Sequence, residues 1–330
     1  MSFCILQSGL LDTIQDQGRF GCGHLGINPS GAMDPLALAV ANVLVGNPYS
    51  EPALEMHFPA PALRFETAAL IALAGADFSP TLDGRPVPVH APVLAGRGSV
   101  LRFGRPVSGA RAYLAVQGGF ALTPWLGSCS THLAAQAGGW EGRALRSGDV
   151  LPFRQEQPTA FSRSAGGNRV LPWKADTRVL YPGKPVVRFV PGAEYAGLEP
   201  AAAARLESAR WTITAQADRM GYRLLGPGLA LQHPVELVSS AVVRGTIQLM
   251  PGGGLIVLMA DSQTTGGYPR IGHAISADAP ALAQMLPGQA FQFQLVQHRH
   301  AFEALRRQQT ALRQLQWGCI FRLREAGLLR

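Results

Sequence analysis

Residues 255–272 read LIVLMADSQTTGGYPRIG, an apolar run followed directly by a polar segment that contains two glycines. The apolar run 255–260 predicts a short, fully buried strand. Five polar residues and two glycines follow it without a break, so a rigid element carries groups that can reach a ligand. The glycines allow positive φ and close backbone approach, and successive N–H groups in such a turn can bind an anion. An ordinary hairpin turn is the alternative, but the density of neutral hydrogen-bonding groups favours a ligand loop.

The composition predicts a compact, turn-rich protein. The chain has 330 residues, which suggests two domains at roughly 100–200 residues each. Hydrophobic residues make up 47% of the chain and charged residues 15%, so each domain can bury a core. Because the chain carries 38 glycines and 25 prolines, we expect short strands and many turns rather than long helices.

The net charge of +8 comes almost entirely from arginine. Only Lys174 and Lys184 are lysines, so 29 − 2 = 27 of the basic residues are arginines. A nucleic-acid-binding surface needs clustered basic residues with interleaved aromatic ones, whereas these arginines are scattered apart from those in 299–313. We therefore expect no nucleic-acid partner, and the charge favours an anionic substrate or an acidic partner.

Targeting and cysteine signals are weak. The four cysteines have no C-x-x-C or zinc-site spacing, and they indicate no disulfide framework. The N-terminal sequence MSFCILQSGLL does not have the pattern of a signal peptide. No apolar run approaches the ~18 residues of a membrane span. These patterns predict a cytoplasmic protein without a membrane partner.

The chain is predicted to have two domains, residues 1–160 and 184–330, joined by a polar linker over 161–183. In the first domain, Asp34 can cap a helix, Pro35 suits its first position, and Gly46 can end it. The second domain should end in a helix near 301–315, whose arginines face solvent or a partner.

Familiar nucleotide-binding and catalytic motifs are either absent from the sequence or lie outside the structural setting that they require. The G-x-G-x-x-G at 21–26 does not lie between a strand and a helix, so it does not indicate dinucleotide binding. The sequence has no P-loop, no H-E-x-x-H and no G-x-S-x-G. His298 and His300 lie two apart at an expected strand end, where a surface pair is favoured over a metal site.

Two polar clusters lie near the N-terminus. The first contains Gln15, Asp16 and Arg19, and the planar fork of Arg19 suits a carboxylate or phosphate. A structural Asp16–Arg19 pair is the alternative. The second includes Asp34 at the helix start, which is a natural anion site. Simple capping of the helix by Asp34 is the alternative there.

Two further clusters lie later in the chain. Ser128, Ser130 and Thr131, with Arg143, suit recognition of a polar ligand, although a turn network is an alternative. Arg219 and Arg223 alternate with Gly221, and from one face of a strand they could hold a carboxylate together. An exposed strand face is the alternative in that case.

Seven motifs occur in order along the chain: TIQDQGRFG, SGAMD, ANVLVGN, GSCSTHLAAQAGGWEGRALRSGD, DRMGYRL, GTIQLM and DSQTTGGYPRIG. In this set and order they resemble the biotin-dependent carboxyltransferase-like family, also called allophanate hydrolase subunit 2, which includes Kip A. Within the family, the likeness is to the bacterial 5-oxoprolinase C subunits, and it runs from Ile5 to Trp317.

The resemblance implies a mainly β fold with a few short helices, built from two cyclophilin-like β-barrel domains. It also implies two partners, a Kip I-type subunit (the B subunit of 5-oxoprolinase) and a LamB-type subunit (the A subunit of 5-oxoprolinase). The implied reaction is the opening of 5-oxoproline to L-glutamate with ATP hydrolysis, which uses ATP and Mg²⁺. The chain is expected to be inactive without its partners.

Two other functions remain open on the same scaffold. A related module of urea carboxylase transfers a carboxyl group from carboxybiotin to urea. The present sequence has no Met-Lys-Met biotin-carrier motif, so biotin would have to arrive on another chain. A Kip A-type regulator that binds a kinase inhibitor is the third possibility.

Opening a lactam requires activation of a poor amide carbonyl, so donors that stabilise developing negative charge are expected at the site. Arginines and the Gly266-Gly267 backbone suit that role, Gln263, Thr264 and Tyr268 suit orientation of the ring amide, and Asp34 or Asp261 suits Mg²⁺ binding or proton transfer. No dedicated metal site is expected. The candidate catalytic residues are Asp34, Arg219, Arg223 and Asp261. The candidate substrate-binding residues are Gln15, Arg19, Ser128, Ser130, Thr131, Arg143, Gln248, Gln263, Thr264, Thr265, Gly266, Gly267 and Tyr268.

Overall fold

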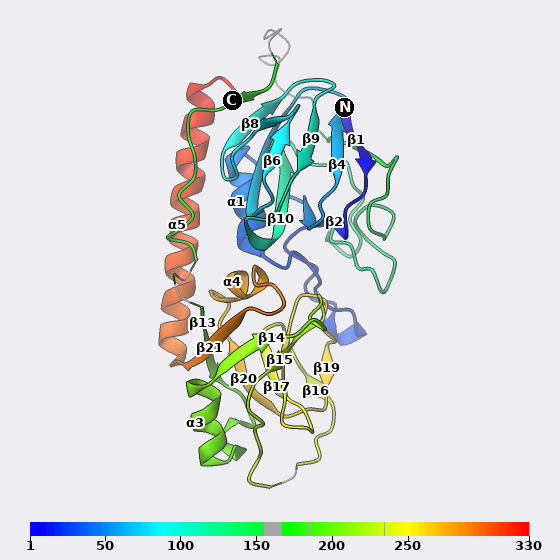
Figure 1. Ribbon diagram of the computed structural model, residues 1–330. Helices are drawn as coiled ribbons and strands as arrows, with labels where there is room; N and C mark the ends of the chain where they lie inside the picture. The colour runs from blue at the N-terminus through cyan, green and yellow to red at the C-terminus, as the bar shows by residue number, and fades with distance from the viewer. Residues whose placement is uncertain (155–166, 182, 184, 234, 330) are drawn as a thin grey trace. The chain divides into compact units, whose positions relative to one another are not determined.

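The computed structural model describes residues 1–154, 167–181, 183, 185–233 and 235–329 (Figure 1). The chain is mainly β with few helices, as its composition and its family likeness predict. It divides into two compact units. The first comprises Met1–Arg19, Asp34–Thr177 and Thr310–Arg330, and the second comprises Phe20–Met33 and Arg178–Gln309. The predicted linker 161–183 lies partly outside the described residues.

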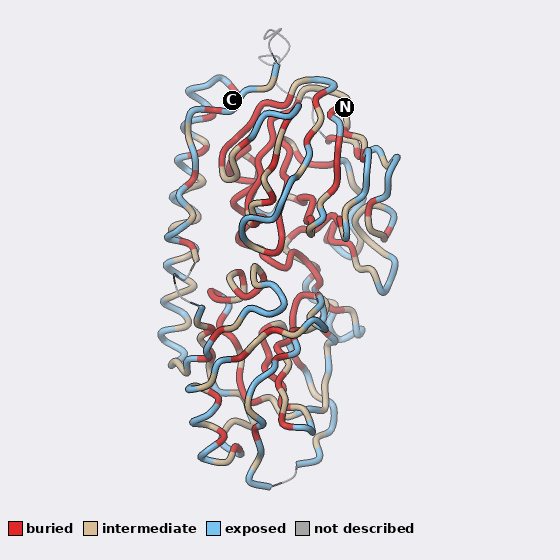
Figure 2. Tube along the Cα trace, viewed as in Figure 1, coloured by how far each residue is buried: buried red, intermediate tan, exposed pale blue. Residues whose placement is uncertain are grey.

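Two six-stranded sheets form the first unit, and every pair of neighbouring strands in them is antiparallel. In order, one sheet contains β11 (Val150–Pro152), β1 (Ser2–Gln7), β4 (Ala62–Phe65), β9 (Val100–Phe103), β6 (Pro80–Leu82) and β7 (Arg85–Pro86). The other contains β12 (Arg169–Val170), β8 (Pro92–Ala95), β5 (Ala69–Asp77), β10 (Ser108–Val116), β3 (Ala53–His57) and β2 (Asp12–Gln15). Phe3, Leu63, Leu114 and Phe120 belong to the core of this unit, which Figure 2 shows as buried strand backbone.

Helix α1 (Pro35–Leu44) begins where the sequence predicts. The Asp34 carboxylate accepts the N–H groups of Leu36 and Ala37, and Pro35 occupies the first turn. The helix is apolar on all sides and buried from residue 36 to residue 44, so its polar Asn42 needs internal partners. Asn42 Nδ2 donates to the carbonyls of residues 38 and 51, and its Oδ1 accepts from Asn47.

A closed seven-stranded barrel forms the second unit. Around the barrel the strands are β13 (Val186–Pro191), β20 (Arg270–Ala274), β17 (Thr246–Leu249), β18 (Leu255–Leu258), β15 (Gly221–Leu225), β14 (Arg210–Ile213) and β21 (Ala290–Leu295). Only β13 and β21 pair in parallel within this described barrel. Trp211, Tyr222, Phe291 and Phe293 fill its core. A short ladder of β16 (Ser240–Ala241) with β19 (Thr265–Gly266) forms separately.

The other helices are η1 (Gly23–Leu25), η2 (Tyr195–Gly197), α3 (Pro200–Ser208), α4 (Ala279–Ala283) and α5 (His298–Glu325). Helix α5 is longer than the predicted 301–315. It contains no proline to end it, and its buried face continues through Cys319 and Leu323. His298 and His300 therefore lie in its first turn, and their predicted place at a strand end is wrong. Within the described residues, none of the helices has the length and apolar character needed to cross a membrane.

Candidate functional site

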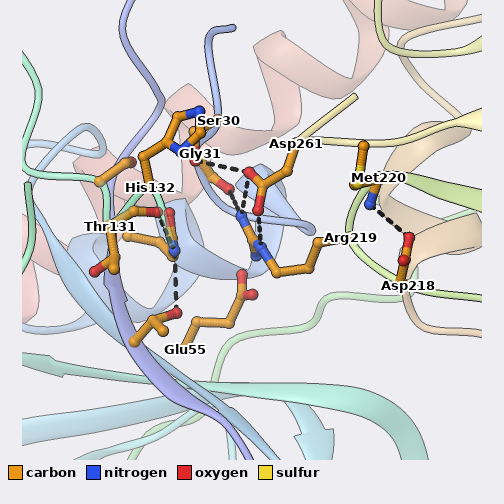
Figure 3. Close-up of polar contacts among 12 residues, drawn as sticks. Ser30, Gly31, Glu55, Thr131, His132, Asp218, Arg219, Met220 and Asp261 are labelled. Carbon is orange, nitrogen blue, oxygen red and sulfur yellow. Dashed lines mark hydrogen bonds and ion pairs between the residues drawn. The ribbon is translucent and has the colours of Figure 1, made fainter. Parts of the chain in front are cut away.

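The predicted site residues are divided between the two units. In the second unit, Arg219 and Asp261 form a two-point ion pair (Figure 3). Arg219 Nε lies 2.7 Å from one carboxylate oxygen of Asp261, and Nη2 lies 3.1 Å from the other. The two side chains are only 7% and 14% exposed, so little water screens the interaction.

The barrel brings these two residues together. Strands β15 and β18 are paired, and the pairing continues past the strands because Asp261 N donates to the Arg219 carbonyl at 2.8 Å. Arg219 sits in a turn before β15, where Asp218 Oδ1 accepts the N–H groups of Met220 and Gly221. The strand begins only at Gly221, so the prediction that Arg219 and Arg223 alternate on one strand face is wrong. Arg223 lies on the exposed face of β15.

Residues 28, 30 and 31 form hydrogen bonds with Arg219 or Asp261, and Figure 3 shows Ser30 and Gly31 beside the ion pair. Ser30 Oγ donates to Asp261 Oδ1 at 2.7 Å, and Asn28 Nδ2 donates to the Asp261 carbonyl at 2.9 Å. Arg219 Nη2 also donates to the Gly31 carbonyl at 2.7 Å. The carboxylate of Asp261 therefore accepts three hydrogen bonds, which fixes the point where the loop 261–269 leaves the barrel.

The loop after β18 differs from the expected anion-binding turn. Thr265 and Gly266 form strand β19 and pair with Ser240 and Ala241. Neither Gly266 nor Gly267 has a positive φ, so their N–H groups do not form the concavity that the sequence predicted. A Cβ on Gly266 would lie 2.7 Å from Gln248 Nε2, so glycine at this position leaves room for the buried amide.

Gln248 carries an unsatisfied buried amide. It lies on β17, on the opposite side of the strand from Ile247 and Leu249, which belong to the barrel core. The residue is 1% exposed, and its Nε2 has no hydrogen-bond partner among the described residues. A buried donor without a partner costs roughly 1–3 kcal/mol, so it marks a place where a ligand acceptor would be stabilised. In the loop that follows β18, Gln263, Thr265 and Tyr268 are exposed and Thr264 is half-buried.

In the first unit, Asp16 organises the predicted serine cluster. Its carboxylate accepts hydrogen bonds from Ser128 Oγ at 2.7 Å and from Ser130 Oγ at 2.6 Å. The N–H groups of Gly18 and Cys129 also donate to it, at 2.8 and 2.6 Å. All three side chains are buried, so these hydroxyls hold the 128–131 loop against β2.

Arg19 joins the same network. Its Nη2 donates to the Ser130 carbonyl, and its guanidinium carbon lies 4.6 Å from the centre of the Trp125 ring. Although Arg19 is charged, it is 1% exposed. Ser130 thus links Asp16 and Arg19, because its hydroxyl donates to the carboxylate and its carbonyl accepts from the guanidinium.

Gln15 and Thr131 lie beside this network. Gln15 Nε2 donates to Thr13 Oγ1 at 3.0 Å and to the Thr131 carbonyl at 3.3 Å. Its Oε1 has no partner within the described part of the chain and is fully buried. Gln15 and Gln248 therefore each present one unsatisfied amide atom, an acceptor in the first unit and a donor in the second.

The Asp34 carboxylate caps the N-terminus of helix α1. Its Oδ1 accepts two helix N–H groups, and its own N–H donates to Tyr113 Oη at 2.8 Å. Tyr113 in turn donates to Glu55 Oε2 at 2.6 Å, and burial, followed by the charge of Glu55, raises the pKa of Tyr113 well above its usual value. The sequence analysis missed Glu55 and Tyr113. The signal was available, because Glu55 is the one acidic residue in the otherwise apolar stretch ALEM.

Arg143 closes a surface turn. It donates from Nη1 and Nη2 to the Asp149 carboxylate at 2.7 and 2.9 Å, and from Nη2 to Glu141. These hydrogen bonds raise the pKa of Arg143 and lower that of Asp149. This arrangement corresponds to the turn network that the sequence left as an alternative. Across the described ranges, no three His, Cys, Asp or Glu side chains come together as a metal site would require.

The comparisons with known proteins agree with the fold and with the motifs. Residues 25–295 match the family described as "Carboxyltransferase domain, subdomain A and B". The chain belongs to this carboxyltransferase-domain family. It is 38% identical to the 5-oxoprolinase C subunit of Haemophilus influenzae, over 92% of this chain and 94% of that protein. It is 39% identical to the 5-oxoprolinase C subunit of Escherichia coli, over 95% and 97% respectively.

A solved structure is also similar to this chain. The urea amidolyase of K. lactis superposes with a TM-score of 0.86 at 27% identity. The match covers 95% of the present chain and 20% of the urea amidolyase chain. In that relative the same fold is therefore one part of a much longer polypeptide.

Proposed function

We propose that this chain is the C subunit of a 5-oxoprolinase complex that opens 5-oxoproline to L-glutamate with ATP hydrolysis. The observation that carries the proposal is the similarity to the two C subunits, which spans nearly the full length of this chain and of each relative. The proposed partners are a Kip I-type B subunit and a LamB-type A subunit in the cytoplasm, and the chain is inactive without them.

Gln248 is the proposed point of contact with the lactam carbonyl. A lactam offers one acceptor oxygen and one N–H donor, and its ring opens only when charge on the oxygen is stabilised. Gln248 Nε2 is a buried donor without a partner in the described structure, so a carbonyl oxygen that reaches it gains a hydrogen bond. Gly266 lies close to this amide, since a Cβ there would be 2.7 Å from Nε2.

Arg219 and Asp261 are proposed as positioning residues rather than as groups that react. Their ion pair, with Ser30, holds the start of the 261–269 loop, which carries Gln263 and Tyr268. Because the Asp261 carboxylate is already bound by Arg219 and Ser30, proton transfer or Mg²⁺ binding there would first require these contacts to break. In the first unit, the buried Arg19 and the Asp16–Ser130 network hold the 128–131 loop in the same way.

The proposed cofactors ATP and Mg²⁺ do not fit this chain's own candidate loop. Gly266 lies in a two-strand ladder and Gly267 has no positive φ, so the loop offers no phosphate cradle. Asp34 caps α1, and Asp261 is ion-paired. We therefore assign the nucleotide to a site on another subunit, or to one that another subunit completes. No step in the present chain is derived through ATP.

The test is glutamate release from 5-oxoproline by the chain co-purified with its Kip I-type partner, with the LamB-type subunit and ATP added. Each component is omitted in turn. A Gln248→Met variant in the full complex should lower kcat/KM for 5-oxoproline at least tenfold, which corresponds to one lost hydrogen bond of about 1.4 kcal/mol. An unchanged kcat/KM would remove Gln248 from the site.

Carboxyl transfer is the second candidate, and the structural match to urea amidolyase favours it. In this case carboxybiotin arrives on another chain and transfers its N-carboxyl group to urea or a similar amide, which leaves biotin on the carrier. Turnover of urea with carboxybiotin, in the absence of any 5-oxoproline turnover, would select this function. A stable complex with the Kip I-type subunit that turns over neither substrate would instead support a regulator.

A further inference from the structure

Helix α5 has two different faces in its C-terminal half. One face carries Cys319 and Leu323, which are 1% and 0% exposed. A Cβ on Gly46 would lie 3.0 Å from Leu323 Cδ1, and Gln117 Nε2 donates to the Leu328 carbonyl at 2.9 Å, just after the helix. These contacts anchor residues 319–328 within the first unit.

The opposite face carries two exposed aromatic side chains between two arginines. Arg313, Trp317, Phe321 and Arg324 are spaced by four, four and three residues, so they form one stripe on the helix. Trp317 is 69% exposed and Phe321 is 60% exposed. The four residues are named the α5 patch. An aromatic centre flanked by arginines is the composition typical of the energetic centre of a protein interface.

Gly318 lies beside the patch, inside a 28-residue helix. Glycine in a helix interior costs roughly 1 kcal/mol relative to alanine. A Cβ at this position would meet nothing within 4 Å among the described residues, so packing within this chain does not require glycine. Glycine here leaves the helix surface flat next to Trp317 and Phe321, which permits a partner to approach the backbone closely.

The positive charge of helix α5 favours an acidic partner. Helix α5 contains six arginines and two glutamates, so its net charge is 6 − 2 = +4, half of the +8 of the whole chain. One of its glutamates, Glu325, pairs with Arg322 at 3.3 Å. A partner surface rich in carboxylates is therefore complementary to this helix, whereas a second copy of the same face would be repelled.

We propose that the α5 patch is the docking surface for an acidic face of a partner protein, with Trp317 and Phe321 in an apolar pocket and Arg313 and Arg324 paired with carboxylates. The inference rests on the proposed function insofar as that function supplies partner subunits. The carboxyltransferase fold covers only 20% of the urea amidolyase chain, so there too it is joined to further protein. A protein fits better than a membrane surface, because the two aromatic side chains are flanked by charges and an interfacial helix needs a wide continuous apolar face.

The experiment measures binding of the full chain to the Kip I-type and LamB-type subunits by sedimentation velocity. The variants are Trp317→Ala, Gly318→Gln and the double reversal Arg313→Glu/Arg324→Glu. Arg85→Glu/Arg102→Glu is the matched control, because both of these arginines are exposed in the first unit and the charge change is identical. Thermal unfolding of every variant checks that the fold persists.

We expect Trp317→Ala and the patch reversal to weaken binding to one of the two subunits at least thirtyfold, the factor for a hot spot of about 2 kcal/mol. Gly318→Gln should weaken it about tenfold without lowering Tm, and the control should bind within twofold of the unmodified chain. Raising the salt concentration should weaken binding of the unmodified chain more than that of the reversal variant, since the latter has lost the charge pairs.

Equal binding by all variants would overturn the docking proposal, even if the complex turned over 5-oxoproline. Loss of binding in the patch variants of a complex that turns over no 5-oxoproline would support docking while the proposed function failed. Failure of the unmodified chain to bind either subunit would overturn both. Sedimentation with vesicles of 30% phosphatidylserine in phosphatidylcholine, lost in the patch variants while subunit binding is retained, would assign the patch to a membrane and overturn docking.

Discussion

Arg219 and Asp261 lie 42 positions apart in the sequence and form a two-point ion pair, with an Nε–Oδ2 distance of 2.7 Å and an Nη2–Oδ1 distance of 3.1 Å. The pair joins the turn before β15 to the end of β18, the two places that the sequence marked with DRMGYRL and DSQTTGGYPRIG. Each side chain is almost buried, so neither charge can be removed without leaving the other in a poorly solvated place.

Arg219→Met should therefore destabilise the protein by about 3 kcal/mol in urea unfolding, because it leaves the Asp261 carboxylate buried without its main partner. Arg223→Met is the control, because Arg223 is exposed on the next strand, and we expect it to change the unfolding free energy by less than about 0.5 kcal/mol. The double variant Arg219→Met/Asp261→Leu should recover part of the loss. Additive losses in the double variant would show that the two residues do not stabilise each other.

Gln248→Met should impair the reaction with 5-oxoproline without lowering the stability of the fold. It replaces an unsatisfied buried amide with an apolar side chain of similar length, so the unfolding free energy should stay constant or rise by about 1 kcal/mol. The kcat/KM of the complex for 5-oxoproline should fall at the same time. A large loss of stability would mean that Gln248 serves packing, and its assignment to the substrate would then be withdrawn.

Asp34 can be tested by a pair of substitutions. Asp34→Asn keeps an oxygen that caps α1, whereas Asp34→Ala removes it, and loss of a cap costs about 1 kcal/mol. If Asp34 only caps the helix, Asp34→Asn should keep the activity of the complex and most of the stability. Loss of turnover in Asp34→Asn with an unchanged Tm would support the proton-transfer or Mg²⁺ role expected from the sequence.

Asp12 should make stability depend on pH. Burial raises its pKa from 3.8 to about 7, against a smaller opposing effect of the Gly9 N–H, which donates to Oδ2 at 2.6 Å. Because the folded-state pKa is above the unfolded one, the associated stability is fully present below pH 3.8 and is lost as pH rises through about 7. The shift corresponds to roughly 4 kcal/mol at most.

The measurement compares the free energy of unfolding at pH 5 and pH 8 for the unmodified chain and for Asp12→Asn. The unmodified chain should lose more stability over this interval than the variant, which cannot ionise at this position. Parallel behaviour of the two proteins would show that Asp12 is solvated or paired in the folded state.

Short-range sequence signals were sufficient to predict some of the secondary-structure elements. Helix α1 begins at Pro35 because Asp34 caps it and proline suits the first turn, and both residues can be recognised without any tertiary contact. The end of α5 was missed because no glycine or proline stops it before residue 318. Cys319 and Leu323 continue its buried face, and Leu323 lies against Gly46, which is distant in the sequence.

The sequence identified groups of neighbouring polar residues in the candidate site, but not the hydrogen bonds that join these groups in the fold. Asp16 and Ser130 were singled out in separate clusters, yet their hydrogen bond spans 114 positions and depends on the fold. The expected anion turn at Gly266-Gly267 was wrong because a distant strand, β16, pairs with this segment. Glu55 stands out as an acidic residue in an apolar strand, but its partner Tyr113 lies 58 positions away and only the structure shows that Tyr113 donates to its carboxylate.

The proposed role of this chain as one of three subunits that open 5-oxoproline can be tested directly by reconstitution. The measurement is the rate of glutamate formation from 5-oxoproline with ATP, for the three purified subunits together and for each pair of them. We expect turnover with all three subunits and at least a hundredfold less when this chain is left out. Equal turnover without this chain, or turnover of urea with carboxybiotin in place of 5-oxoproline, would contradict this role.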